Sequence, residues 1–470
     1  MRLRGTFVHA QQLGNVEILH DHLLVTDSSG FITHFQPAQS SESQAALNSG
    51  ADPCVTLPDG QFVVPNFVDL HLHAPQFLYQ GNGLHLPLME WLNEYAFKAE
   101  ERLDGDPALA RRVYSRLARR LIQNGTGTVL LFGTIKEETN LILAEVMQAA
   151  GLRAFVGKLS MDISSRPSYK ESSAQESLKA AHSFVEKCRG LTSSLPANER
   201  LVEPVLTPRF VPTCSDELLV GLGKLSATED IKIQSHLAEA HDQVEFVRTE
   251  RGVEDIEIFD RAKYTSQSGL LTTRTVQAHC TFLDVPSFKH VHSCGTAIAH
   301  CPLSNSYFSA EPFHLREALD EGVKVGLGTD IAGGYSLDLM SAMRHAVSTS
   351  RMRRGSKIMA GRGDDGKTLA IDWQESLYLA TKGGAAALGL PTGAFAVGSP
   401  FDAQEISLFD PQGTGIGALD FFDLEATGRA GSMSDPPVTL EMVEKWWCLG
   451  EARNRAGMWV QGVRLDISPL

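Results

Sequence analysis

Eight short runs of apolar, β-favouring residues recur through the middle of this chain, and they constrain its fold more than any other feature. Most of the runs are followed by a stretch with helical periodicity, and no hairpin signal joins one run to the next. Strands that alternate with helices in this way form parallel βα units. Eight such units predict an α/β fold on a closed (β/α)8 TIM-like barrel, and the count alone leaves a doubly wound open sheet as an alternative. The runs span residues 67–73, 128–133, 154–162, 202–210, 231–236, 275–280, 296–301 and 324–330.

Both ends of the chain depart from this alternation and are rich in short predicted strands. These strands span residues 6–9, 23–25, 31–35, 404–409 and 458–463. Because a β-rich flank lies on each side of the barrel, we expect the two flanks to form one small β-sandwich domain. The expected division is the N-terminal part of that domain at 1–64, the barrel at 65–390, and the C-terminal part of the domain at 391–470. Two glycine-containing stretches, 413–417 and 431–437, are predicted to be loops.

The composition limits the partners and the compartment that we expect. A formal net charge of −14 disfavours a nucleic-acid partner, because such binding depends on clustered lysines and arginines. The seven cysteines are scattered and include no CxxC pair, which indicates reduced thiols in a cytoplasmic protein. No apolar run approaches the roughly 20 residues of a membrane span, and residues 1–14 lack the apolar core of a signal peptide. A protein that acts away from membranes on a neutral or cationic small molecule is therefore expected.

A pair of histidines ends the first barrel run. His71 and His73 are two residues apart, so in a strand both imidazoles point to the same face and can reach one metal ion. The chain contains two more such pairs, at 20–22 in the β flank and at 290–292 ahead of the seventh run. Only His71 and His73 lie at a carboxyl strand end, where barrel enzymes place their active sites.

Other strand ends add compatible side chains. His236 ends the fifth run, His279 ends the sixth, and Asp330 ends the eighth. A lone histidine in such a place is usually structural and a lone aspartate is often a helix N-cap, but the strand ends of a barrel converge on one mouth. Imidazoles with one carboxylate form a ligand set suited to Zn²⁺ or Fe²⁺. The five residues together predict a metal centre at the barrel mouth.

These positions carry a resemblance to a known family. The segment Val64 to His73, VPNFVDLHLH, is similar to the opening signature of the amidohydrolase superfamily, and the later histidines and aspartate follow in its order. Asn66 departs from the glycine that usually follows the proline, although asparagine also tolerates a positive φ. The HxE…PCxxC signature of the cytidine-deaminase type of zinc enzyme is absent from the sequence. Within the superfamily the chain most resembles the branch that deaminates guanine, on segments 4–9, 86–91, 153–158, 207–210, 299–302 and 326–336.

The resemblance implies a zinc-dependent hydrolysis of guanine to xanthine and ammonia, as in purine catabolism. It implies one Zn²⁺ per chain, and the implied ligands are His71, His73, His236 and Asp330. It further implies that His279 hydrogen-bonds water or substrate beside the metal and that Asp330 takes a proton from the attacking water. Glu239 is implied to protonate the ring and then to help deliver a proton to the departing ammonia.

The same resemblance implies how guanine is recognised. Gln76 would read the purine edge, Arg209 would hydrogen-bond O6 or N7, and Phe210 would stack on the ring. Taken without the resemblance, Arg209 fits a surface ion pair and Phe210 fits ordinary core. Trp91 is expected to pack the loop after the first strand. Further implied substrate contacts are His73, His236, Glu239 and Asp330, and a homodimer is the implied assembly.

Two alternatives stay open. Another aminohydrolase of the superfamily would use the same metal site on a triazine, an adenosine derivative or cytosine. A barrel that had lost catalysis would act as a scaffold through its surface. Gln76 with the Arg209–Phe210 pair favours guanine, and the complete ligand set with Glu239 favours an enzyme.

Overall fold

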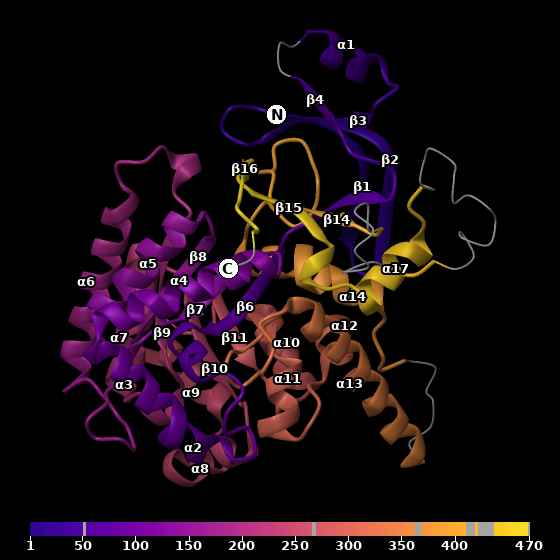
Figure 1. Cartoon of the computed structure of the whole chain (residues 1–470). Coiled ribbons are helices and arrows are strands. Elements are labelled where there is room, and N and C mark those ends of the chain that lie inside the picture. Colours follow the sequence, from indigo (N-terminus) through magenta and orange to yellow (C-terminus); the bar gives the residue numbers. More distant parts are fainter. Residues whose placement is uncertain (50–52, 266–268, 362–367, 410–418, 422–436, 469–470) are drawn as a thin grey trace.

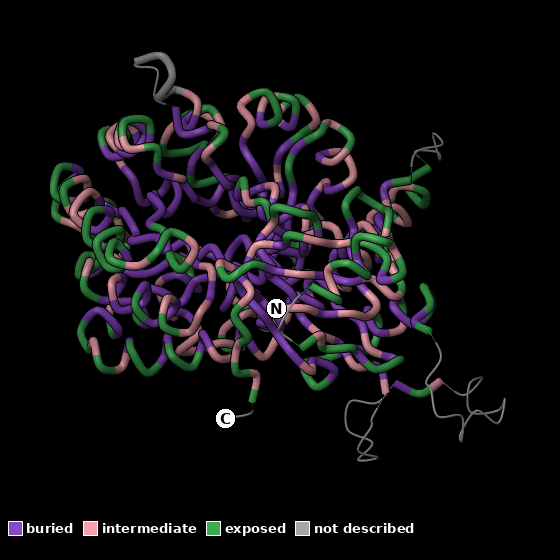
Figure 2. Tube along the Cα trace, turned by 90° about the horizontal axis from the view of Figure 1, so that it is seen from above, coloured by how far each residue is buried: buried purple, intermediate pink, exposed green. Residues whose placement is uncertain are grey.

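The fold has two parts, a barrel and a smaller group of strands to which both terminal parts of the chain contribute (Figure 1). The computed structural model describes residues 1–470 apart from 50–52, 266–268, 362–367, 410–418, 422–436 and 469–470, and the backbone alone at 261–265. Figure 2, seen from above, shows buried residues within the barrel and exposed residues around its outer rim. A chain with this division has a dry interior in which a site can be built.

The barrel consists of eight parallel strands, each paired with the next along the chain. Asp330 N–H donates to the His71 carbonyl at 2.8 Å and His73 N–H donates to the Ile331 carbonyl at 3.0 Å, so the last strand meets the first. The predicted barrel is therefore confirmed, and the open-sheet alternative is excluded. The strands are β6 (Phe67–His73), β7 (Thr126–Phe132), β8 (Arg153–Ser160), β9 (Val202–Pro208), β10 (Ile233–Leu237), β11 (Thr275–His279), β12 (Ala297–His300) and β13 (Lys324–Leu327).

Helices follow most of the strands and cover the outside of the barrel (Figure 1). Every residue of β6 and β7 is buried, because a parallel sheet in a barrel is covered on both faces. The helices between barrel strands include α5 (Glu137–Ala150), α6 (Ala174–Thr192), α7 (Asp216–Glu229), α8 (His241–Arg251), α9 (Asp255–Thr265), α10 (Val285–Cys294), α11 (Pro302–Ser304) and α12 (Leu315–Asp320). After the last strand come α13 (Leu339–Met359), α14 (Trp373–Tyr378) and α15 (Gly384–Leu388).

The long connection after β6 divides into several pieces. It contains α2 (Leu88–Trp91), a wide turn at Leu92–Ala96, α3 (Phe97–Gly105) and α4 (Pro107–Gln123). The break before α4 follows from Pro107, which has no N–H to continue the preceding helix but fits the first position of a new one. The Asp106 side chain accepts a hydrogen bond from Leu109 N–H at 2.9 Å and caps this new helix.

The second part is a sheet whose strands follow the order β16-β15-β14-β5-β1-β2-β3, with β4 paired to β1. Antiparallel pairing of β5 with β14 brings the two ends of the chain together, as the β-rich flanks predicted. The N-terminal strands are β1 (Arg2–Gln12), β2 (Asn15–Thr26), β3 (Ile32–Pro37), β4 (Cys54–Thr56) and β5 (Gln61–Pro65), with α1 (Ser41–Ser49) between β3 and β4. The C-terminal elements are β14 (Ala403–Ser407), α17 (Leu440–Leu449), β15 (Arg455–Val460) and β16 (Val463–Arg464).

Asn66, which departs from the family's glycine, lies where the terminal sheet meets the barrel. It is not among the residues with positive φ, so the tolerance expected for that conformation is not used. Its side-chain amide instead donates to the Trp459 carbonyl at 2.6 Å. Asparagine here joins the start of β6 to β15 by a buried hydrogen bond.

Some expectations concern parts that the structure covers incompletely. The expected loop at 413–417 lies outside the described residues, as does that at 431–437 apart from Pro437. Within the described residues, no helix is long and apolar enough to cross a bilayer. All seven cysteines lie in the described part, and each is a free thiol.

Candidate metal and substrate site

The predicted ligands meet at the carboxyl ends of the barrel strands. His71 and His73 lie on β6, His236 lies on β10, His279 ends β11, and Asp330 follows β13. Two of these residues have left-handed backbone, with φ of +68° at His279 and +49° at Asp330. For residues other than glycine this conformation costs free energy, and such strain is concentrated at functional sites. The strand ends therefore aim these side chains into the mouth instead of continuing the sheet.

The ligand atoms form a compact group. Asp330 Oδ1 lies 3.2 Å from His71 Nε2 and 3.6 Å from His73 Nε2. His73 Nε2 lies 3.0 Å from His236 Nε2, and His279 Nε2 lies 3.7 Å from Asp330 Oδ2. The five residues predicted from their positions in the sequence are thus together in one cluster.

Hydrogen bonds from two of the rings assign their protons. His236 Nδ1–H donates to the Arg209 carbonyl at 2.6 Å, and His279 Nδ1–H donates to Asn305 Oδ1 at 3.0 Å. In a neutral ring this leaves the Nε2 lone pair free to bind a metal. Burial lowers the pKa of His71, His73 and His236 well below the ordinary value, so these imidazoles are neutral at pH 7.

The chemistry of these donors fits a zinc ion. In the described structure the Nε2 atoms of His71 and His279 make no hydrogen bond, although each lies within 4 Å of a carboxylate oxygen. Burial raises the pKa of Asp330, and a bound cation would stabilise its ionised carboxylate. Neutral imidazoles with one carboxylate are the ligands that Zn²⁺ takes in catalytic sites.

Two more carboxylates lie beside this cluster. Glu239 Oε1, between β10 and α8, lies 3.5 Å from His279 Nε2. Burial, followed by repulsion from Asp330, raises the pKa of Glu239 well above its ordinary value. Asp69 accepts from Thr329 Oγ1 at 2.5 Å and from the His71 N–H at 3.2 Å, and burial raises its pKa to about 7. Asp69 thereby ties β6 to the segment after β13, beneath the ligands.

A small cavity opens beside the ligand cluster. Its polar lining consists of His73, Gln76, Arg209, His236, Glu239 and Asp330, and its apolar lining includes Leu88, Trp91, Leu92, Phe210 and Phe308. Every predicted site residue except His71 and His279 lines this cavity, and those two lie in the cluster itself. The same cavity therefore adjoins the metal-ligand cluster and several aromatic rings.

Arg209 is buried and is not part of a surface ion pair. Its Nη1 donates to Glu100 Oε2 at 2.6 Å, and its guanidinium lies 4.9 Å from the centre of the Phe97 ring. Its Nη2 has no hydrogen-bond partner within the described part of the chain. Gln76 accepts from Ala332 N–H at 3.1 Å and donates to Glu100 Oε1 at 3.2 Å. The two polar side chains expected to read the substrate are therefore linked through one carboxylate.

The aromatic lining differs from the expectation in one respect. Trp91 was expected only to pack its loop, and its indole N–H does donate to the Asn82 carbonyl at 3.3 Å. However, its ring also lines the cavity and lies 5.0 Å from the Phe308 ring. The expectation was incomplete because α2 crosses the barrel mouth, which no local pattern in that segment encodes. Phe210 lines the same cavity, 6.1 Å from the His236 ring.

Sequence reasoning missed several residues of this region. Glu100 is buried on the face of α3 that carries Phe97 and Leu103, so a charge at an apolar helical position was the available signal. Asn305 and Asp69 act through hydrogen bonds to the ligands, which their positions in the sequence do not reveal. Phe132 packs against His71, His73 and His236, with ring centres 4.6–4.8 Å apart.

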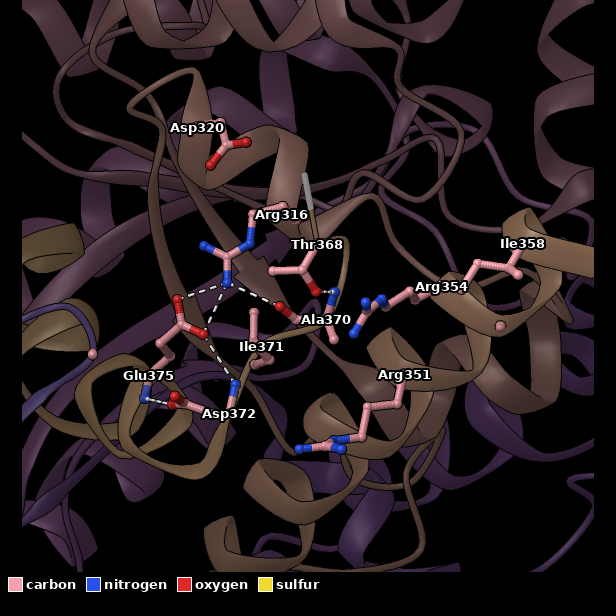
Figure 3. A pocket seen from close by; sticks show the side chains of 12 residues that line it. Arg316, Asp320, Arg351, Arg354, Ile358, Thr368, Ala370, Ile371, Asp372 and Glu375 are labelled. Carbon is pink, nitrogen blue, oxygen red and sulfur yellow. Dashed lines mark hydrogen bonds and ion pairs between the residues drawn. The ribbon is translucent and has the colours of Figure 1, made fainter. Parts of the chain in front are cut away.

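A second cavity is lined mainly by residues of α12, α13 and α14, and it shares no lining residue with the first (Figure 3). Arg316 projects into it and donates to both oxygens of Glu375, at 2.7 and 2.8 Å, and to the Ala370 carbonyl at 3.0 Å. Arg351 and Asp372 also line it. None of the predicted site residues belongs to this cavity, and its lining includes no histidine.

Comparison with known proteins agrees with the geometry of the mouth. Residues 62–452 match the model of the Amidohydrolase family. A human guanine deaminase is 37% identical over 468 residues, covering 98% of this chain and 95% of that protein. A guanine deaminase from C. acetobutylicum, solved with guanine bound in the active site, has a TM-score of 0.83 at 27% identity and 99% coverage of both chains.

A more distant structure shares the fold alone. It is an adenosine deaminase from Xanthomonas campestris with bound zinc, with a TM-score of 0.74 and 21% identity, covering 98% of this chain and 92% of that one.

Proposed function

The chain belongs to the amidohydrolase family, and we propose that it hydrolyses guanine to xanthine and ammonia with one zinc ion per chain. The observation that carries this proposal is a single cavity that combines the His–Asp ligand cluster, Glu239, and the Arg209–Gln76 pair. Relatives that match along nearly the whole chain are guanine deaminases, which supports the same substrate. Conversion of guanine to xanthine would belong to purine catabolism.

Zinc would be held by His71, His73, His236 and Asp330. His71 Nε2, which has no hydrogen-bond partner among the described residues, and the Asp330 carboxylate beside His71 and His73 support this assignment. When bound, zinc lowers the pKa of water to near 7, so a hydroxide nucleophile is available at neutral pH. A structurally similar deaminase contains bound zinc, which is consistent with the same metal here.

The chain's own residues move the protons. Water adds through its oxygen to C2 of guanine, the C2–amine bond breaks, and ammonia leaves. Asp330 accepts the proton that the attacking water loses. Glu239 protonates the ring nitrogen and then helps to deliver a proton to the departing amine, for which a carboxyl with a raised pKa is suited. His279, 3.5 Å from Glu239 Oε1, orients the reacting groups from the other side.

Substrate recognition combines one unpaired donor with aromatic faces. Arg209 Nη2, which lacks a partner among the described residues, would donate to O6 or N7 of the purine. Gln76 would contact the purine edge, and Phe210 would stack on the ring. The implied contacts of His73, His236, Glu239 and Asp330 with substrate are supported by their places in the cavity lining.

The rival functions have less support. A triazine or cytosine lacks the fused purine edge for which the Arg209–Gln76 pair would be arranged, and a non-catalytic scaffold would not need a complete buried ligand set. We also propose a cytoplasmic location, supported by seven free thiols. The homodimer and the division of the chain at residues 64 and 390 are further proposals, which light scattering and limited proteolysis test.

The decisive experiment is incubation of the zinc-loaded protein with guanine. We expect xanthine and ammonia in equal amounts, with xanthine identified by chromatography and ammonia by a coupled enzymatic assay. A panel containing adenine, adenosine, cytosine and an amino-triazine is run in parallel. If the loaded protein leaves guanine intact but releases ammonia from another member of the panel, the proposed function is wrong and the first alternative replaces it.

A further inference from the structure

Glu100 is a buried carboxylate that contacts both substrate-reading side chains. It lies on α3, is fully buried, and is outside the lining of the cavity. Its Oε2 accepts from Arg209 Nη1 at 2.6 Å, and its Oε1 accepts from Gln76 Nε2 at 3.2 Å. Arg209 and Gln76 come from different barrel strand ends, so Glu100 is the direct link between them.

We propose that Glu100 is a positioning residue that determines specificity for guanine, by fixing Arg209 and Gln76 in the geometry that accepts the O6 carbonyl. This inference rests on the proposed function. Glu100 does not line the cavity, so it acts through its two partners and not on the substrate.

Only a carboxylate can serve both partners. Its two oxygens are acceptors alone, whereas a glutamine would turn an N–H₂ group toward either the Arg209 or the Gln76 donor. The carboxylate also supplies the counter-charge for a guanidinium that is buried almost completely. Burial lowers the pKa of Arg209, but Glu100, together with Tyr169 and Tyr79, leaves it raised above its ordinary value. Removal of Glu100 would leave an uncompensated buried charge, which is costly.

The shape of the guanidinium converts this contact into specificity. The group is planar and its donors form a rigid fork, so holding Nη1 on Glu100 fixes the direction of Nη2. The Phe97 ring, 4.9 Å from the guanidinium carbon, restricts the remaining rotation. Nη2 is buried and has no partner in the described structure. A buried donor held in this way favours a ligand with an acceptor at that point and disfavours one without it.

The test compares Glu100→Gln with Glu101→Gln, a matched control from the next position of the same helix. Glu101 also pairs with an arginine, Arg166 at 2.6 Å, but that pair is partly exposed. Each variant is assayed on guanine and on 2-aminopurine, which carries the same C2 amine but no O6. We expect Glu100→Gln to lower kcat/KM for guanine about 10²-fold, mainly through KM, since Arg209 loses the partner that fixes its direction toward O6. We expect less than about a 3-fold change for 2-aminopurine, and neither substrate should be affected in Glu101→Gln.

Other outcomes overturn the inference. Equal losses on both substrates would show a merely structural role, and wild-type behaviour of Glu100→Gln would show no role. If Glu100→Gln does not fold, Arg209→Met and the double variant Glu100→Gln/Arg209→Met are compared, because the arginine charge that Glu100→Gln leaves uncompensated is absent from both. Equal activity of these two on guanine, or a further loss in the double variant that is confined to guanine, supports action through Arg209 and Gln76, whereas an equal further loss on both substrates contradicts it. Failure of the wild-type protein on guanine would instead refute the proposed function.

Discussion

Two regions of this chain bring three metal-ligand side chains within 4.8 Å of one another, and they differ in almost everything else. At the barrel mouth the cluster of His71, His73 and Asp330 is buried, with side chains no more than 6% exposed. On the outside of the barrel, Asp260 of α9 meets His290 and Cys294 of α10, and the His290 and Asp260 side chains are 36% and 27% exposed. The mouth cluster also adjoins a cavity that is lined by polar and aromatic side chains.

Burial gives the same side chains different chemistry. At the mouth, ring nitrogens lack hydrogen-bond partners among the described residues, and solvent does not reach them. At the outer cluster, His290 Nε2 lies 3.3 Å from Asp260 Oδ1 and 3.7 Å from Cys294 Sγ, and the His290 and Asp260 side chains are partly exposed. Proximity of ligand types is therefore a weak criterion for a metal site. A stronger criterion for a metal site is a buried ring nitrogen that has no hydrogen-bond partner.

Two histidine pairs with the same spacing, 71/73 and 290/292, lie in different secondary structures, and this difference decides whether both rings can reach one site. In β6, residues two apart point to the same side, so His71 and His73 both reach the ligand cluster. In α10, residues two apart are on different sides of the helix, since each residue advances about 100°. His290 accordingly faces Asp260, whereas His292 Nδ1–H donates to the Gly322 carbonyl at 2.9 Å.

The largest effect that tests this comparison is loss of the metal. We expect His71→Ala, His236→Ala and Asp330→Ala to reduce zinc well below one equivalent per chain and guanine turnover to background. The reason is that each removes a ligand from a buried site that cannot recruit a substitute. Elemental analysis and steady-state kinetics measure the two quantities. Well-folded wild-type protein that contained no metal, and gained no activity with added zinc, would contradict this assignment.

Much of this site can be predicted from the sequence, because the topology of a barrel brings the carboxyl ends of its strands together. Once His71, His236, His279 and Asp330 are read as strand ends, the fold brings them together whatever the loops do. The barrel topology does not determine the path of the segment after β6. This path depends on tertiary packing across the mouth, which is why Trp91 was assigned to loop packing alone. Glu100 was missed for a related reason, since its partner Arg209 lies 109 residues away.

The second effect concerns selectivity, which an enclosed site provides and an open cluster does not. Adenine carries its amine at C6 and has no O6 acceptor, so a buried Arg209 Nη2 that donates to O6 of guanine would stay unpaired when adenine binds. Sites built on such hydrogen bonds discriminate by about 10⁴-fold. We expect kcat/KM for guanine to exceed that for adenine by this order, measured by ammonia release. Comparable values would mean that the mouth does not read O6.

The third effect separates proton transfer from metal binding within the buried cluster. Glu239→Gln keeps the size of the side chain but removes the group that exchanges a proton. Zinc content should stay near that of the wild type, while kcat falls about 10²-fold or more, the usual scale of general acid–base catalysis. Binding of guanine should weaken much less, because the loss belongs to the transition state. Near-normal kcat would leave the proton transfers to Asp330 or His279.

The smallest effect is expected where the outer cluster is dismantled. His290→Ala removes a partly exposed ion pair with Asp260 and a contact with Cys294, and such pairs contribute about 1 kcal/mol or less to stability. The free energy of unfolding, measured in denaturant, should therefore change by no more than about that amount. Zinc content and guanine turnover should equal those of the wild type, in contrast to His71→Ala.

Cys294→Ser is a second variant for this test, because it keeps His290 and removes only the thiol. If purified protein contained two equivalents of zinc and both variants lost one, the outer cluster would be a metal site despite its exposure. Burial would then no longer distinguish the two regions, and the difference between them would be the substrate cavity alone.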